Sequence, residues 1–366
     1  MGPANSNAVY AQGYLLFLRD QTLMAQPFDN RRLELKGQAA GVAEQVDVVR
    51  TGATLVGFSA SADILALPPS DERDLQLAWY DRAGNVVGTI GEPGAYQHLA
   101  ISPEGTRMAV TKGSEAGRGS NLWLLDLSRD AASARFSFGS LVDSGPVWSP
   151  DGSRIVFSSN RDGPFNLYQK PVNGVKDEEL LLKSSEDNVA TSWSRDGRFL
   201  LYTVVPSKGK GEIWVLPMEG DRKPVAFLAT RFNESQAQFS PDRHWVAYTS
   251  DESGHNEVYV GSFSMNSAGT AAVAGGKWPI SNGGGTAPHW RADGRELFYD
   301  RDANDTMAVE IATIPSFRAG IPHPLGSSPF RAWDSAADGK RFIAPGIKRG
   351  QQPATVVLNW QAGLKK

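Results

Sequence analysis

The chain contains no cysteine among its 366 residues, which excludes disulfide bonds, thiolate nucleophiles and cysteine-ligated zinc. No apolar run approaches the roughly 18 residues that a membrane-spanning helix needs. Residues Met1 to Tyr10 have neither the basic region nor the apolar core of a signal peptide. We therefore expect no membrane insertion by this chain, and a cytoplasmic location if it is expressed as written.

The chain also lacks an excess of charge of either sign. Its formal net charge is −3, and its basic residues are scattered without a block of like charge. Binding to a phosphate backbone requires a cationic surface, so we expect no nucleic-acid partner. The 38 glycines and 22 prolines favour many turns, and together with the aromatic residues they predict short strands over long helices.

The common catalytic motifs are missing as well. There is no Gly-x-Ser-x-Gly elbow and no glycine-rich phosphate loop followed by lysine. The five histidines include no pair at the i, i+4 spacing of a helical zinc site. No reaction class is therefore indicated by motif alone.

A tandem repeat dominates what is present. The phrase Val147-Trp148-Ser149-Pro150-Asp151-Gly152, followed by an apolar strand, returns in related form from Ser192, from Gln238 and from His289. Proline presets φ, aspartate bonds its own backbone and glycine accepts positive φ, so the phrase predicts a sharp turn between two strands. The acidic turn residues fall at positions 63, 104, 151, 196, 242, 293 and 338. A period of about 45 residues is typical of four-stranded propeller blades.

The predicted fold is therefore an all-β propeller of four-stranded antiparallel blades, with eight blades expected and seven as the alternative. One domain is expected over residues 1–366, with repeat units at residues 6–46, 54–91, 96–139, 144–184, 188–230, 234–281, 285–328 and 329–361. The equivalent aromatic residues of the inner strands are expected to pack between neighbouring blades. They are Trp148, Trp193, Phe239 and Trp290.

The Ser-Pro-Asp-Gly turn, the Ser-Asn-Arg-Asp-Gly hairpin at 159–163 and the Leu-Tyr strand after it resemble the TolB-like, WD40-like (PD40) propeller repeat. Four further stretches are similar to the C-terminal propeller region of acidobacterial-type serine/threonine protein kinases; they are residues 13–17, 22–29, 276–281 and 355–360. That resemblance implies an extracytoplasmic or periplasmic sensor or scaffold. The kinase motifs themselves are absent from this chain, so kinase activity is not carried over.

The loops that enter the innermost strands are expected to bring polar side chains together at one mouth of the central channel. Convergent carboxylate, amide and imidazole groups could hold a calcium ion or a polar ligand there. The alternative for this mouth is an ordinary water-filled channel. The candidate ligand-binding residues are His98, Asp143, Asn188, Glu234, Gln236 and His289.

Two functions fit this pattern. The first is a non-catalytic module that binds a protein or a small polar ligand on one rim of the propeller and acts as a sensor or scaffold. The second is a calcium-dependent hydrolase of lactones, esters or phosphotriesters, in which the cation polarises the substrate and His98 or His289 acts as base. The first is favoured because no catalytic residue is identified and because fold alone says little about function.

Overall fold

The structure is a computed structural model that describes residues 8–19, 22–43, 49–51, 54–56, 59–61, 64–67, 75–114, 119–128, 133–139, 141–265, 272–302, 305–314, 316–326, 333–347 and 355–364. Its regular structure is almost all β-strand, with one 3-10 helix, η1 (Trp360–Leu364). Among these residues no helix is long and apolar enough to span a bilayer. The expected all-β class is confirmed.

Contacts divide the chain into two compact units, and each is described by itself. Unit 1 comprises residues 1–71 and 349–366, and unit 2 comprises residues 72–348. Unit 1 holds a five-stranded sheet, a three-stranded sheet in the order β35-β9-β8 and the hairpin β6-β7. Its strands are β1 (Val9–Ala11), β2 (Tyr14–Arg19), β3 (Thr22–Asp29), β4 (Glu34–Leu35), β5 (Ala40–Ala43), β6 (Val49–Thr51), β7 (Thr54–Val56), β8 (Ser59–Ala60), β9 (Ile64–Leu67) and β35 (Thr355–Leu358).

Unit 1 draws its core from both ends of the chain. Leu16, Leu23 and Leu65 are fully buried, and they share one apolar cluster with Trp360 of η1. The terminal strand β35 pairs antiparallel with β9, so that Val357 lies opposite Leu65. The two terminal segments therefore stabilise each other in one small unit.

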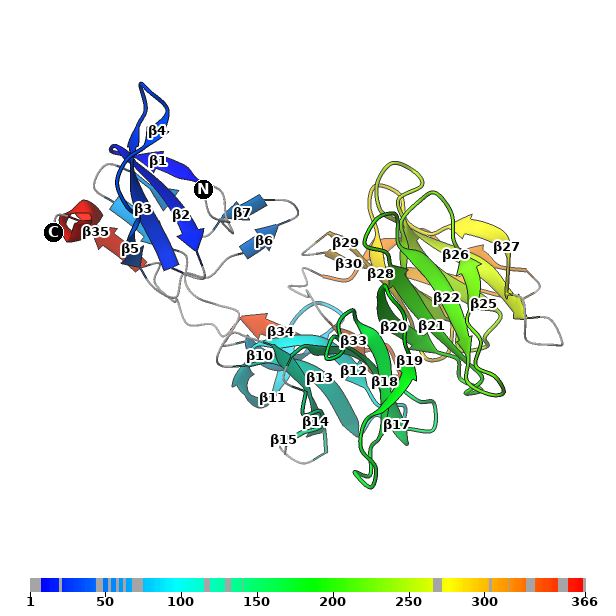
Figure 1. Cartoon of the computed structure of the whole chain (residues 1–366). Coiled ribbons are helices and arrows are strands. Elements are labelled where there is room, and N and C mark those ends of the chain that lie inside the picture. Colours follow the sequence, from blue (N-terminus) through cyan, green and yellow to red (C-terminus); the bar gives the residue numbers. More distant parts are fainter. Residues whose placement is uncertain are drawn as a thin grey trace. The chain divides into compact units, whose positions relative to one another are not determined.

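Unit 2 consists of four-stranded antiparallel sheets that repeat along the chain, one of which carries a fifth short strand (Figure 1). Four of them run in simple sequence order from the innermost to the outermost strand. Their strands are β12 (Tyr96–Ile101), β13 (Arg107–Gly113), β14 (Ser120–Asp126) and β15 (Ser133–Arg135); β16 (Asp143–Trp148), β17 (Arg154–Ser159), β18 (Asn166–Pro171) and β19 (Glu179–Leu182); β20 (Asp187–Trp193), β21 (Phe199–Val205), β22 (Glu212–Pro217) and β23 (Val225–Leu228); and β24 (Glu234–Phe239), β25 (Trp245–Ser250), β26 (Glu257–Met265) and β27 (Ala272–Pro279).

The remaining two sheets of unit 2 lie at its ends in sequence. One contains β28 (Thr286–Trp290), β29 (Glu296–Asp302), β30 (Asp305–Ala312), β31 (Arg318–Ala319) and β32 (His323–Pro324). The other has the order β11-β10-β34-β33 and is assembled from β10 (Leu75–Asp81), β11 (Val86–Gly94), β33 (Asp334–Ser335) and β34 (Arg341–Ile347).

This composite sheet closes the ring of unit 2. Phe342 of β34 packs on Phe298 of β29, with their ring centroids 5.2 Å apart. On its other face, Leu77 and Ile343 share an apolar cluster with Met108 of β13. The six sheets of unit 2 therefore follow one another in a closed cycle, as expected for a propeller.

The pairing differs from the arrangement of eight self-contained repeat units. Residues from the expected units 54–91 and 329–361 share one sheet, because β10 pairs with β34 from Leu75 opposite Ile347 to Asp81 opposite Arg341. Neither eight nor seven blades are confirmed, since the described strands of unit 2 make six such sheets. The turn residue expected at position 63 lies outside the described residues.

The Ser-Pro-Asp-Gly turn has the geometry that its residues predict. Asp151 accepts hydrogen bonds from Ser149 Oγ at 2.5 Å and from the backbone and side chain of Ser153. Burial opposes ionisation only weakly here, and the hydrogen bonds from Ser149 and Ser153 lower the pKa of Asp151 to about 2. Gly152 has φ of 67°, a conformation that disfavours side chains. Each inner strand is thereby turned back onto the next one.

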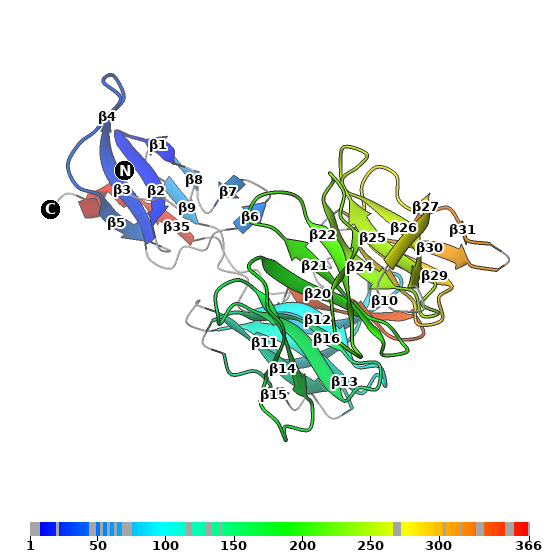
Figure 2. The same ribbon diagram turned by 45° about the vertical axis from the view of Figure 1, so that its right-hand side comes forward.

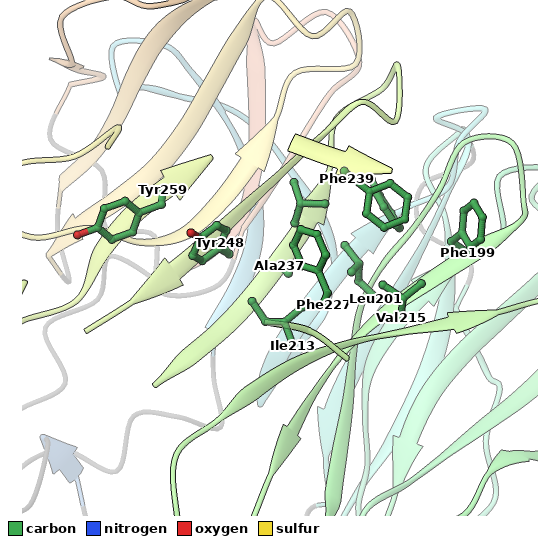
Figure 3. Close-up of a cluster of buried hydrophobic side chains, with 11 residues drawn as sticks. Phe199, Leu201, Ile213, Val215, Phe227, Ala237, Phe239, Tyr248 and Tyr259 are labelled. Atoms are coloured by element: carbon green, nitrogen blue, oxygen red, sulfur yellow. The ribbon is translucent and has the colours of Figure 1, made fainter. Parts of the chain in front are cut away.

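The predicted inner aromatic residues pack between neighbouring sheets, and Figure 3 shows the apolar cluster that contains one of them, Phe239. Phe239 lies between β21 and β26, where its ring centroid is 4.9 Å from that of Phe263. Phe199 of the preceding sheet contacts the same ring at 5.6 Å. Trp148, Trp193 and Trp290 are buried at the equivalent position of their own sheets. The prediction that these residues belong to the core is confirmed.

We expect Phe239→Ala to lower the free energy of unfolding by about 3–5 kcal/mol, because it leaves a cavity between two sheets. Urea denaturation followed by tryptophan fluorescence measures the change. The matched control is Val175→Ala, because Val175 is 79% exposed and its truncation should change stability by less than about 0.5 kcal/mol. Equal effects of the two substitutions would contradict the packing described above.

Candidate functional site

The candidate site is a cavity of about 680 Å³ in the central channel of unit 2. The innermost strands β12, β16 and β20 lie side by side there (Figure 2). Its wall combines aromatic, proline and polar side chains from these strands, from the turns that follow them and from β24, β28 and β33. The lining includes Pro103, Glu104, Pro146, Trp148, Asp151, Thr191, Trp193, Arg195, Gln238, His289, Trp333 and Asp334.

Each innermost strand from β12 to β28 is interrupted by an irregularity at the same place. The register shifts between Ser144 and Val147 in β16, and at equivalent positions in β12, β20, β24 and β28. Gly145, Gln236 and Ala287 occupy this position with φ between 50° and 63°. Such bulges redirect side chains and are common next to binding sites. The half of each strand after the bulge lines the cavity.

Three of the six predicted residues precede the bulge and are buried between the sheets instead of facing the channel. Asp143 accepts a hydrogen bond from Arg161 at 2.9 Å. Burial alone would raise its pKa, but hydrogen bonds from Ser137, Ser159 and Arg161 lower it.

Asn188 and Glu234 occupy the position equivalent to Asp143. The Asn188 amide donates to the carbonyl oxygens of Phe165 and Glu186. Glu234 accepts from Thr230 at 2.5 Å, and burial raises the pKa of its carboxyl group. These side chains join loops to strands, so they hold the sheets together.

Two further predicted residues lie on the strand-entry side of the channel. His98 Nδ1 lies 3.0 Å from Ser144 Oγ on the neighbouring strand. Its side chain is solvent-accessible, but surrounding protein atoms desolvate the imidazole and lower its pKa. Gln236 Oε1 accepts from Thr249 Oγ1 and from the backbone of Ala287, both at 2.9 Å. Neither His98 nor Gln236 lines the cavity.

His289 is the predicted residue that does line the cavity. Its Nε2 lies 3.0 Å from Asp334 Oδ1, and its Nδ1 lies 3.3 Å from Gln238 Nε2. Since the Gln238 amide nitrogen can only donate, Nδ1 accepts and Nε2 carries the proton toward Asp334. The other oxygen of Asp334 accepts the N–H of Ile101 at 2.6 Å. The network therefore links four sheets across the point where the ring closes.

Below this network lies a carboxyl group with an unusual pKa. Asp300 Oδ1 accepts hydrogen bonds from Trp333 Nε1 at 2.8 Å and from Thr306 Oγ1 at 3.1 Å. Burial dominates these contacts and raises the pKa of Asp300 to about 7. The Trp333 ring also lies 5.4 Å from the His289 ring. Asp300 is therefore coupled to the cavity wall through Trp333.

Sequence reasoning missed Gln238, Trp333 and Asp334. Gln238 and Asp334 occupy the same repeat position as His289, just before the inner aromatic position. Aligning the copies at their turns would have found them. The described residues contain no group of three His, Asp or Glu side chains placed to hold a metal ion. A calcium ion was one of the alternatives that the sequence left open for the channel, and it stays untested.

The fold and the cavity define a β-propeller with an accessible central channel. Residues 83–208 match the family model of the TolB beta propeller domain, PD40. The chain is 26% identical over 159 residues to the Tol-Pal system protein TolB of Alcanivorax borkumensis. That match covers 42% of this chain and 36% of the relative, so the chain spans about a third of the length of that protein.

Solved structures support the same fold. A protein of Agrobacterium tumefaciens assigned as a TolB superposes with a TM-score of 0.59 at 16% identity, covering 76% of this chain and 99% of that one. TolB from Acinetobacter baumannii superposes with a TM-score of 0.50 at 14% identity, covering 94% and 80%. The PD40, TolB-like part of the predicted resemblance is confirmed. The resemblance to the kinase propeller is not shown.

Because its pKa is raised, Asp300 contributes stability that is lost as pH rises. In the unfolded chain an aspartate ionises near its ordinary pKa of 3.8, whereas in the folded protein Asp300 retains its proton up to about pH 7. The folded state therefore binds more protons in this window, and stability falls from about pH 4 to pH 7. We expect Asp300→Asn to remove this decline, as measured by urea denaturation across that range. Asp221→Asn, at a side chain that is 82% exposed, should leave the decline unchanged.

Proposed function

We propose that this chain provides a binding module, a TolB-like propeller that holds a polar ligand or a segment of a partner protein in the cavity of its central channel. The observation that carries the proposal is the cavity itself. It measures about 680 Å³, and its wall combines Trp148, Trp193 and Trp333 with a small number of fixed polar groups. Binding sites have this composition, in which apolar walls supply contact area and a few polar groups supply orientation.

The polar wall is rigid. His289, Asp334 and Gln238 are fixed by hydrogen bonds that cross from sheet to sheet. The indole N–H of Trp148 donates to Ala100 O at 2.9 Å, and that of Trp290 donates to Gln238 O at 3.3 Å. A preformed wall reduces the entropy lost on binding. The channel is therefore suited to recognition without rearrangement.

The comparisons support a binding role at a coarse level. The relative from Alcanivorax borkumensis is named as a component of the Tol-Pal system. By analogy, this propeller acts as a sensor or scaffold that recognises a protein or a small polar ligand, and an extracytoplasmic location is part of the same proposal. Association with a kinase rests only on the sequence resemblance and stays a prediction. Nothing in the described residues favours the metal-dependent hydrolase over this binding role.

Blocking the cavity should abolish binding. Thr191 lines the cavity at the bulge of β20, so we expect Thr191→Trp to fill the space beside Trp148 and Trp193. Peptides are selected from a display library on the full wild-type chain, and their dissociation constants are then measured by calorimetry. We expect binding to Thr191→Trp to weaken by about 100-fold or more, because ligand and indole would occupy the same volume.

The matched control is Val175→Trp, which adds the same side chain at a position that is 79% exposed. It should bind the selected peptides as the wild-type protein does. Circular dichroism confirms that both variants are folded. Undiminished binding to folded Thr191→Trp would show that recognition occurs elsewhere on the propeller.

A further inference from the structure

One position of the repeat forms a ring of side chains around the channel. It comes directly before the inner aromatic position, and its members pair with equivalent residues of the second strand in each sheet. Two neighbouring members are apolar and the other four are polar. The members, in order around the channel, are Ala100, Val147, Ser192, Gln238, His289 and Asp334.

The backbone N–H of the next residue faces into this ring. Ser149 N donates to Arg154 O at 2.9 Å, and Ser194 N donates to Phe199 O at 2.8 Å. Alternate residues of an antiparallel strand point toward and away from the neighbouring strand. The preceding residues, Trp148 and Trp193, therefore direct their N–H groups away from the sheet and into the channel.

At three of the polar positions of the ring, a side chain of the preceding sheet accepts the N–H of the next sheet. Phe239 N donates to Ser192 Oγ at 3.1 Å, and Trp290 N donates to Gln238 Oε1 at 3.4 Å. Ile101 N donates to Asp334 Oδ2 at 2.6 Å. The last contact shows that a carboxylate fits against an N–H of this ring.

At the two apolar positions of the ring, the side chain offers no acceptor. Ala100 precedes Trp148 in the ring and Val147 precedes Trp193, and neither side chain carries a polar atom. Within the described residues, neither N–H has a hydrogen-bond acceptor. Backbone donors in folded proteins pair with protein, water or ligand, so these two N–H groups can receive an acceptor that enters the channel.

Positive charge lies beside the same two tryptophans. Arg195 lines the cavity; its guanidinium donates to Ala292 O at 3.5 Å and forms no ion pair with a carboxylate of the described chain. Arg107 and Arg154 lie over the rings of Trp148 and Trp193, at 5.1 and 5.7 Å from the centroids. Arg107 pairs with Glu104, and Glu104, Asp151 and Asp334 line the same cavity. Arg195 is the cation of the described lining that has no carboxylate partner, so it is the group that a ligand carboxylate would pair with.

We propose that the N–H groups of Trp148 and Trp193, together with Arg195, form a carboxylate-binding site in the central cavity. This inference rests on the proposed binding function and names the chemistry that the cavity recognises. The carboxylate belongs either to a small organic acid or to the C-terminus of a peptide. In both cases the apolar part of the ligand contacts Trp148, Trp193 and the neighbouring prolines.

The test supplies an acceptor for each of the two N–H groups by substituting serine at Ala100 and Val147. In Ala100→Ser/Val147→Ser, each new hydroxyl reproduces the contact of Ser192 with Phe239 N and occupies the N–H that the ligand would use. The matched control is Val147→Ala, which shortens the same side chain without adding an oxygen. Both variants should fold, and the serine variant should melt at or above the temperature of the control, because it pairs two enclosed donors.

The probes are N-acetylphenylalanine and its neutral amide, and a tetrapeptide ending in phenylalanine with a free or an amidated C-terminus. Calorimetry on the full chain should detect the acids with wild-type protein and with Val147→Ala. Binding to the serine variant and to Arg195→Gln should each be weaker by about tenfold or more, the scale of a lost hydrogen bond to a charged group. If only the peptide acid binds, the source is a chain terminus; if both acids bind, the carboxylate group suffices.

Equal affinity for acid and amide, equal affinity of the serine variant and Val147→Ala, or no binding of any acid to the wild-type protein would each overturn the inference. Failure of the proposed function looks different. If peptides selected on the wild-type chain bind Thr191→Trp unchanged, the cavity is not the binding site at all. If Thr191→Trp loses them while the serine variant retains them, the cavity binds ligand without recognising a carboxylate.

Discussion

The structure depends on the fact that the innermost strand of each sheet forms backbone hydrogen bonds along one edge only. Alternate N–H and C=O groups of that strand must face away from the sheet. When sheets are arranged radially, these groups gather around the channel, and each enclosed one requires a partner. Ser192, Gln238 and Asp334 each accept one of these N–H groups with their side chains. The channel is therefore chemically asymmetric because the repeat position before the aromatic residue varies.

The polar ring positions His289 and Asp334 lie where the ring is closed. The composite sheet joins β10 to β34, which are separated by most of unit 2 in sequence. Asp334 begins β33 and contacts both neighbouring sheets, through His289 on one side and Ile101 on the other. A carboxylate at this position satisfies channel donors and fastens the two ends of unit 2 at the same time. Substitutions at Asp334 should therefore affect closure, whereas Val147 lies one sheet further from the seam.

The sequence predicted the features that are encoded locally. The Ser-Pro-Asp-Gly turn and the inner aromatic positions recur with a fixed period, because each turn and each buried ring is determined by a few adjacent residues. The pairing of β10 and β11 with β33 and β34 was not predicted, because the first and last copies are degraded and their partners are distant in sequence. Strand pairing over such separations leaves little local signal.

The site was predicted less well for a related reason. The entry loops do carry polar residues, but Asp143 and Glu234 are buried between the sheets before the strand reaches its bulge. The bulge decides which residues line the cavity, and of its left-handed positions only Gly145 has a residue type that suggests this conformation. Of the six predicted residues, His289 is the one that follows the bulge and lines the cavity. Its ring partners Gln238 and Asp334 could be recognised only by aligning the copies at their turns.

The hydrogen bonds of the cavity also bear on the kind of ligand that it can recognise. A general base must have a lone pair free to take a proton. Both nitrogens of His289 are engaged, Asp334 accepts from Ile101, Ser335 and His289, and Asp151 is held by its own turn. Two backbone N–H groups and the Arg195 guanidinium remain as donors in the described wall. A wall that offers these donors is suited to bind a ligand with hydrogen-bond acceptors.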